Sequence, residues 1–214
     1  MIDGPRLPPA SGGPAKHLVV FLHGYGADGN DLIDIGRYWA AALPDAAFVS
    51  PHAPEPCAQA PMGRQWFPLT VIDMDLIADG VRHAAPALDA FLDAELASLG
   101  LSDAQLALVG FSQGAMMALH VGPRRRSPIA GIVGYSGMLA GPEQLAAEAT
   151  GKPPILLVHG EIDPVVPVMT LHAAVPALGA AGFDVEWHVS PGLQHGIDNT
   201  GLELGASFLR RVLT

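Results

Sequence analysis

The sequence predicts an α/β fold: a single domain built on a mostly parallel central sheet with helices on both faces. Short runs that are apolar at every position alternate along the chain with longer segments of helical periodicity, which is typical of parallel strands buried on both faces. The chain has 214 residues, of which 50% are hydrophobic and 15% are charged, enough for one domain with a large core. We expect this domain to span residues 17–214, after a flexible segment over residues 1–16, and to carry no large lid domain.

The first half of the chain is predicted to contain two strands and two helices. The helical segments are recognised by apolar residues three and four positions apart, and the second contains Pro86, which is expected to kink or split it. A segment with five prolines is expected to form a long loop. In order, the elements are a strand over 17–22, a helix over 30–43, a strand over 46–50, the loop over 51–73 and a helix over 76–99.

The second half is predicted to continue the alternation of strand and helix. A basic run over residues 124–126 follows one of its helices and is interpreted as a solvated helix end rather than a nucleic-acid patch. The expected strands cover 106–109, 129–135, 155–159 and 185–189. The expected helices cover 115–121, 168–178 and 202–213.

The composition argues against several classes of partner. The net charge is −10, and so acidic a chain repels phosphate backbones and anionic membrane surfaces. The apolar runs are far shorter than the ~20 residues of a membrane span, so we expect neither nucleic-acid binding nor stable membrane insertion. The single cysteine, Cys57, permits no internal disulfide. With no signal peptide visible over residues 1–13, we expect a cytoplasmic protein.

The segment over residues 110–114, with the sequence GFSQG, predicts a nucleophilic serine. It lies between a predicted strand and a predicted helix, which is the position of a nucleophile elbow, a sharp turn that exposes the hydroxyl of Ser112. The flanking glycines are needed because such a turn leaves no room for side chains beside the serine. A near match over residues 134–138 lacks the second glycine, so Ser136 is interpreted as structural.

A serine nucleophile needs a base to take its proton and an acid to orient that base. In this arrangement the acid and then the histidine follow the serine, each in a loop after the carboxyl end of a strand. Asp163 and His195 meet that condition, and we predict that they complete a triad with Ser112. Rivals are a second acid in the same loop, an acid just past the histidine and two histidines of predicted strands: Glu161, Asp198, His159 and His188. The two strand histidines are interpreted as structural.

An oxyanion hole should supply two backbone N–H groups to the carbonyl oxygen of the substrate. One donor is predicted at Gln113, the residue after the nucleophile. The other is expected in the loop after the first strand, residues 22–26 with the sequence LHGYG, whose glycines let the backbone approach a substrate closely.

Four segments in chain order resemble the phospholipase/carboxylesterase family, which includes the acyl-protein thioesterases: residues 21–32, 110–114, 159–167 and 195–197. The resemblance implies the α/β-hydrolase fold, hydrolysis of carboxylic esters through an acyl-enzyme, and no metal or organic cofactor. It places the triad on Ser112, Asp163 and His195 and the oxyanion amides on Leu22 and Gln113. The implied substrates are small acyl esters, lysophospholipids and thioesters of acylated proteins.

The loop over 51–73 is predicted to determine substrate specificity. At residues 63–67 it resembles the Trp-Phe motif of the same family. Its apolar residues would either line an acyl groove or anchor the loop to the core, and the sequence leaves both interpretations open. These residues are Met62, Trp66, Phe67, Leu69 and Ile72.

Three classes of function are compatible with these motifs: an esterase or thioesterase, another hydrolase of the same fold such as a dienelactone-type hydrolase or a peptidase, and an inactive fold that only binds ligands. The dienelactone type carries a cysteine at the elbow, where this chain has Ser112. Inactive members lose a triad residue or an elbow glycine, and this chain keeps them all. We therefore favour the esterase or thioesterase, as a monomer or a homodimer.

Overall fold

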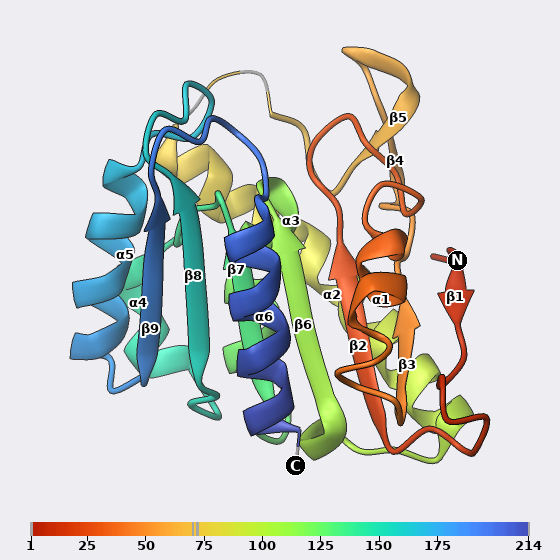
Figure 1. Ribbon diagram of the computed structural model, residues 1–214. Coiled ribbons are helices and arrows are strands. Elements are labelled where there is room, and N and C mark those ends of the chain that lie inside the picture. The colour runs from red at the N-terminus through yellow and green to blue at the C-terminus, as the bar shows by residue number, and fades with distance from the viewer. Residues whose placement is uncertain (1, 70, 72, 214) are drawn as a thin grey trace.

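The computed structural model describes residues 2–69, 71 and 73–213. Its centre is a seven-stranded sheet with the strand order β1-β3-β2-β6-β7-β8-β9 (Figure 1). From β3 to β9 all neighbours run parallel, and among the described strands of this sheet β1 alone pairs antiparallel, with β3. This confirms the mostly parallel sheet. The strands are β1 Arg6–Leu7, β2 His17–Leu22, β3 Ala46–Val49, β6 Leu106–Phe111, β7 Gly131–Tyr135, β8 Ile155–Gly160 and β9 Val185–Ser190.

Helices cover both faces of the sheet, as predicted (Figure 1). Side chains of β2 alternate between the two cores: Leu18 and Val20 belong to one, and Val19 and Phe21 belong to the other. All these side chains are buried, which is why the strand is apolar at every position. The helices are α1 Ile33–Trp39 and α6 Asn199–Val212 on one face, and α2 Met74–Leu99, α3 Gln113–Val121, α4 Pro142–Glu148 and α5 Met169–Ala180 on the other.

One predicted helix is much shorter than expected, and another is not interrupted where a proline was expected to kink or split it. The helix expected over 30–43 is only Ile33–Trp39, because the side chain of Asp28 accepts a hydrogen bond from the amide of Asn30 and holds that segment in a turn. Pro86 does not split α2, which runs unbroken from an N-cap at Asp73 to a left-handed Gly100. Packing of one helical face into the core therefore outweighs the local effect of the proline.

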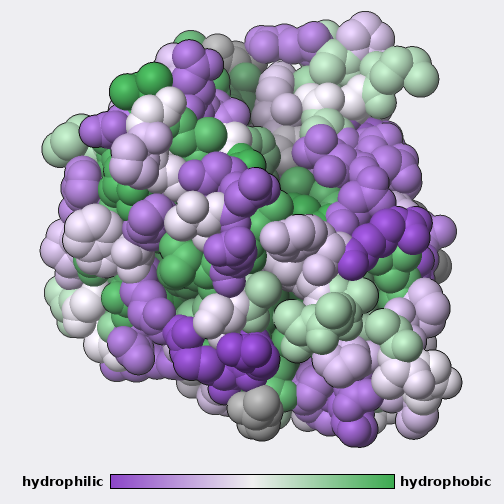
Figure 2. All heavy atoms as spheres, viewed as in Figure 1, coloured by the Kyte–Doolittle hydropathy of each residue, from purple (hydrophilic) through white to green (hydrophobic). Residues whose placement is uncertain are grey.

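Three elements were not expected from the sequence. The predicted loop over 51–73 contains a hairpin of β4 Glu55–Cys57 and β5 Ala60–Gln65, and this hairpin projects at the upper right of the molecule (Figures 1 and 2). The segment over 1–16 contains β1, and helix α4 follows β7. All of these elements are short, which gives little periodicity to recognise. β1 forms by pairing with the distant strand β3, and β4 and β5 pair with each other.

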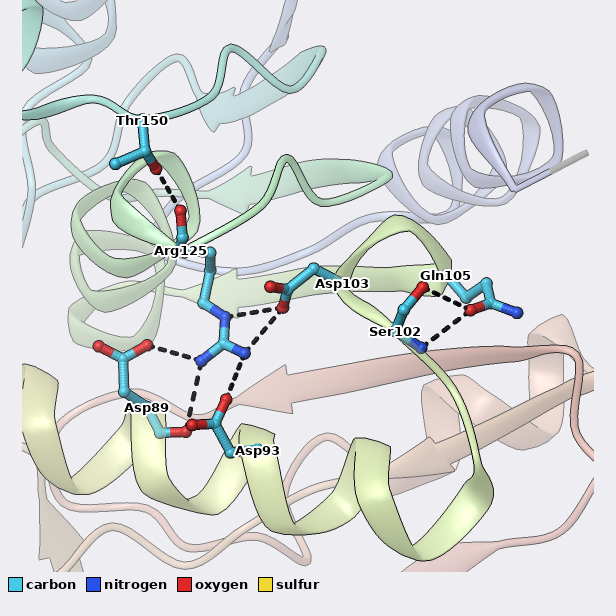
Figure 3. Close-up of polar contacts among 7 residues, drawn as sticks. All are labelled: Asp89, Asp93, Ser102, Asp103, Gln105, Arg125 and Thr150. Carbon is cyan, nitrogen blue, oxygen red and sulfur yellow. Dashed lines mark hydrogen bonds and ion pairs between the residues drawn. The ribbon is translucent and has the colours of Figure 1, made fainter.

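The basic run over residues 124–126 is not simply a solvated helix end, and this prediction is wrong for its middle residue. Arg125 is buried, and its guanidinium donates hydrogen bonds to three carboxylates, those of Asp89, Asp93 and Asp103 (Figure 3). A buried arginine needs such partners because an unpaired charge is strongly disfavoured inside a protein. The network ties the turn after α3 to α2.

On the face shown in Figure 2, hydrophilic and hydrophobic residues are interspersed. In the described part of the chain, no helix is both long and apolar enough to cross a bilayer. The parallel strands β2, β6, β8 and β9 all end at the upper edge of the sheet in Figure 1, so the loops that follow them meet there.

Candidate active site

Ser112 occupies a strained turn between the end of β6 and the start of α3. Its backbone has φ 53° and ψ −117°, a conformation that costs a non-glycine residue about 1–3 kcal/mol. A Cβ at Gly114 would lie 1.8 Å from the carbonyl oxygen of Leu22, and one at Gly110 would lie 2.3 Å from the carbonyl oxygen of Gly114. The turn therefore requires both glycines of the motif, as the sequence predicted.

His195 and Asp163 are joined by a short hydrogen bond. The distance from Nδ1 of His195 to Oδ2 of Asp163 is 2.6 Å, and Oδ1 of Asp163 accepts the amides of Val165 and Val166 at 2.8 and 2.9 Å. Burial raises the pKa of Asp163, but the hydrogen bonds from His195 and the two amides outweigh it, so the net pKa lies below its ordinary value. An ionised Asp163 keeps the proton on Nδ1 and leaves Nε2 of His195 free to act as a base.

Three of the four rival residues make hydrogen bonds of their own. Glu161 accepts the amide of Gly192 at 2.9 Å, and Asp198 caps α6 by accepting the amide of Gly201 at 2.7 Å. His159 lies near the end of β8, where its Nε2 is 2.7 Å from the carbonyl oxygen of Val166 and 3.5 Å from Oδ2 of Asp163. These contacts are structural, and Asp163 is the acid that the fold brings to His195.

Ser112 and His195 line one cavity of about 210 Å³. The ring of Phe111 packs against the imidazole of His195, with 4.8 Å between the ring centres. One part of the cavity wall is apolar, and another part consists of the loop after β2. The apolar part contains Leu69, Ile77, Met116, Met138, Val165 and Val166, and the loop part contains Gly24, Tyr25, Ala27 and Asp31.

The two predicted oxyanion residues lie on adjoining segments. Leu22 is the last residue of β2, and Gln113 is the first residue of α3. The close approach of Gly114 to the carbonyl of Leu22 packs the start of the helix against the end of the strand. The amide of Gln113 belongs to the N-terminal turn of α3, where unpaired N–H groups favour negative charge.

The side chain of Gln113 has a second role that the sequence analysis missed. It is fully buried, its Oε1 accepts the amide of Trp66 at 2.9 Å, and its Nε2 donates to the carbonyl of Phe67 at 2.8 Å. The indole of Trp66 donates to the carbonyl of His23 at 3.0 Å. Gln113 thus ties the segment after β5 to the elbow. No local pattern signals these contacts, because Trp66 and Phe67 lie 47 and 46 residues before Gln113 in the chain.

The structure separates the five residues proposed for the acyl groove. Leu69 lines the cavity, whereas Trp66 and Phe67 are 1% and 0% exposed in the core and anchor the loop. Met62 is 92% exposed near the tip of the hairpin and borders a second groove, which shares Ala27 and Asp31 with the catalytic cavity. Ile72 lies outside the described residues. The position of Leu69 is compatible with the groove interpretation, and the burial of the two aromatic residues is compatible with the anchor interpretation.

Within the described residues, no group of three or more histidine, cysteine or acidic side chains is arranged to hold a metal ion. The polar side chains that line the cavity are those of Tyr25, Asp31, Ser112 and His195. Of these, the serine and the histidine are the groups used in acyl transfer by a serine nucleophile.

Comparison with known proteins agrees with this geometry. The phospholipase/carboxylesterase family matches residues 9–213. Esterase YpfH of Escherichia coli is 32% identical over 92% of this chain and 83% of its own, and acyl-protein thioesterase 1 of Saccharomyces cerevisiae is 30% identical over 94% and 95%. The crystal structure of esterase PE8 superimposes with a TM-score of 0.95 at 47% identity, covering 99% of both chains.

Proposed function

Since this chain belongs to the phospholipase/carboxylesterase family and is a serine ester hydrolase, we propose that Ser112, His195 and Asp163 form its catalytic triad. The observation that carries the proposal is the hydrogen bond between His195 and Asp163 beside a cavity that also contains the strained Ser112. The amides of Leu22 and Gln113 are proposed as the oxyanion hole.

In the first half of the reaction, Oγ of Ser112 attacks the carbonyl carbon of the ester while Nε2 of His195 takes the serine proton. Asp163 stabilises the imidazolium that results. The carbonyl oxygen becomes an oxyanion, and each of the two amides can stabilise it by about 2.7–4 kcal/mol. When the tetrahedral intermediate collapses, the imidazolium returns the proton to the leaving alcohol or thiol, and the acyl group stays on the serine.

In the second half, His195 takes a proton from water, and the resulting hydroxide attacks the acyl-enzyme. A second tetrahedral intermediate forms in the same oxyanion hole. Its collapse releases the carboxylic acid and returns the proton to Ser112. Esters and thioesters share this route, since only the first leaving group differs.

The cavity volume supports a preference among acyl groups. At about 210 Å³ it is smaller than the roughly 300–1,000 Å³ of pockets that enclose drug-sized ligands. We propose that short acyl groups occupy its apolar end. Lysophospholipids and acylated proteins are further candidate substrates, whose longer chains would extend beyond the cavity. The proposed setting is the cytoplasm, with the chain acting as a monomer or a homodimer.

Hydrolysis of p-nitrophenyl esters from acetate to palmitate tests the proposal, with Ser112→Ala as the variant and Ser136→Ala as the matched control. Ser136 is the rival serine and is buried. We expect Ser112→Ala to lose on the order of 10⁶-fold in kcat, Ser136→Ala to remain active, and wild-type kcat/KM to peak at short chains. An active Ser112→Ala enzyme would refute the assignment, and a palmitate optimum would refute the short-chain preference.

A further inference from the structure

We propose that Asp31 determines specificity for the leaving group, by favouring alcohols and thiols that carry a positive charge over those that carry a negative one. The inference rests on the proposed function, because it assigns one end of the catalytic cavity to the acyl group and the other to the leaving group. The relevant observations are the lining of the cavity, the partners of its charged side chain and the surface that continues from it.

Asp31 is the one carboxylate among the residues that line the catalytic cavity, and no lysine or arginine lines it. It belongs to the part of the wall formed by the loop after β2, with Gly24, Tyr25 and Ala27. The remaining wall, apart from Ser112 and His195, is apolar. A substrate in this cavity therefore meets an extensive apolar surface and a single negative charge.

The carboxylate of Asp31 differs from those of its neighbours in lacking a partner. Asp28 accepts the amide of Asn30 at 2.8 Å, and Asp34 accepts Nε of Arg37 at 2.8 Å. For Asp31, no side-chain hydrogen bond or ion pair is found within the described chain. Partial burial, and secondarily the negative charge of Asp28, raises the pKa of Asp31 above its ordinary value.

The cavity continues past Asp31 into a second, open groove of about 590 Å³. Ala27 and Asp31 line both spaces, so the two are contiguous. The groove lies between the loop after β2 and the β4–β5 hairpin, and its charged side chains are those of Asp28 and Asp31. If the acyl group occupies the apolar part of the cavity, the alcohol or thiol of the ester extends into this groove. A cationic group there would be attracted and an anionic group repelled.

Three thioesters with the same butyryl group test the inference. Their thiols are thiocholine, which is cationic, its neutral carbon analogue 3,3-dimethylbutanethiol, and 3-mercaptopropionate, which is anionic. We expect the wild-type ratio of kcat/KM for the cationic over the anionic substrate to be on the order of tenfold at low salt, and to fall as the ionic strength rises.

Asp31→Asn removes the charge while keeping the size of the side chain, and it should bring that ratio to within about twofold of one. Asp34→Asn is the matched control. It removes the same charge from an exposed carboxylate that lies three residues after Asp31 and outside the cavity. This control should keep the wild-type ratio. If Asp31→Asn keeps the ratio, or if both variants reduce it equally, the inference is overturned.

A second pair of substrates tests the orientation. Methyl butyrate and monomethyl succinate differ by a carboxylate on the acyl group, so Asp31→Asn should leave their ratio nearly unchanged. A large change in this ratio would place Asp31 at the acyl end and overturn the assignment to the leaving group. Failure of the inference is distinct from failure of the proposed function. Hydrolysis of the neutral thioester by wild type but not by Ser112→Ala supports the triad whatever the charge ratio, whereas a wild type inert on all substrates refutes both.

Discussion

We expect Gln113→Met to destabilise the protein, although it alters no triad side chain and no backbone amide. The side chain of Gln113 accepts the amide of Trp66 and donates to the carbonyl of Phe67, at 2.9 and 2.8 Å, in a buried position. Methionine has nearly the same length and can fill the space, but it makes neither hydrogen bond. One buried N–H and one buried C=O would then lose their partner.

The expected loss follows from these two groups. Each buried polar group left without a partner costs about 1–3 kcal/mol, so the loss of two should lower the free energy of unfolding by about 2–6 kcal/mol. That is a large part of the ~5–15 kcal/mol typical of a domain. The change should also reach the cavity, because Leu69 lies two residues past Phe67 and forms part of its wall. We therefore expect kcat/KM to fall more for butyrate esters than for acetate esters.

Urea unfolding, followed by circular dichroism, measures the first effect, and p-nitrophenyl ester hydrolysis measures the second. Gln144→Met on α4 is the matched control. Its side chain is exposed, and its unfolding free energy should stay within about 0.5 kcal/mol of wild type. If Gln113→Met were as stable as this control, the two hydrogen bonds would add nothing net, and the reasoning would be refuted.

Three further predictions concern regions away from the cavity. Burial lowers the pKa of His120 from 6.5 to about 4. As pH falls across that window, the unfolded chain binds a proton before the folded one, and stability should drop by about 2–3 kcal/mol, a loss that His120→Met removes in urea titrations. Arg125→Met should lower the free energy of unfolding by about 3 kcal/mol, whereas Arg126→Met, at an exposed neighbour, should change it by less than ~0.5 kcal/mol. In hydrogen exchange, residues 1–16 should exchange faster than β2, because β1 pairs over two residues with one strand.

Each of these has a contrary outcome. An equal pH dependence of stability in wild type and His120→Met would mean that the imidazole is solvated in the folded state. Equal losses from the two arginine substitutions would show that the three aspartates add nothing to the anchoring of Arg125. Slow exchange in β1, matching that of β2, would contradict a flexible N-terminal segment.

The parallel strands β2, β3 and β6 to β9, and the elbow, could be predicted from the sequence because their causes are local. A strand buried on both faces must be apolar at each position, and Val19 and Val20 lie in different cores for that reason. The turn at Ser112 needs glycine on both sides because a Cβ there would overlap backbone atoms. Such constraints act over a few residues, so they leave a readable pattern in the chain.

The pairing of side chains was decided only by the tertiary structure. Asp163 and Glu161 satisfied the same sequence rule, but Asp163 is the one that reaches His195, 32 residues away in the chain. The core positions of Trp66 and Arg125 depend in the same way on partners brought by distant segments. A hydrogen bond depends on distance through space, and for groups far apart in sequence that distance is set by how the whole chain packs, so no local pattern records it.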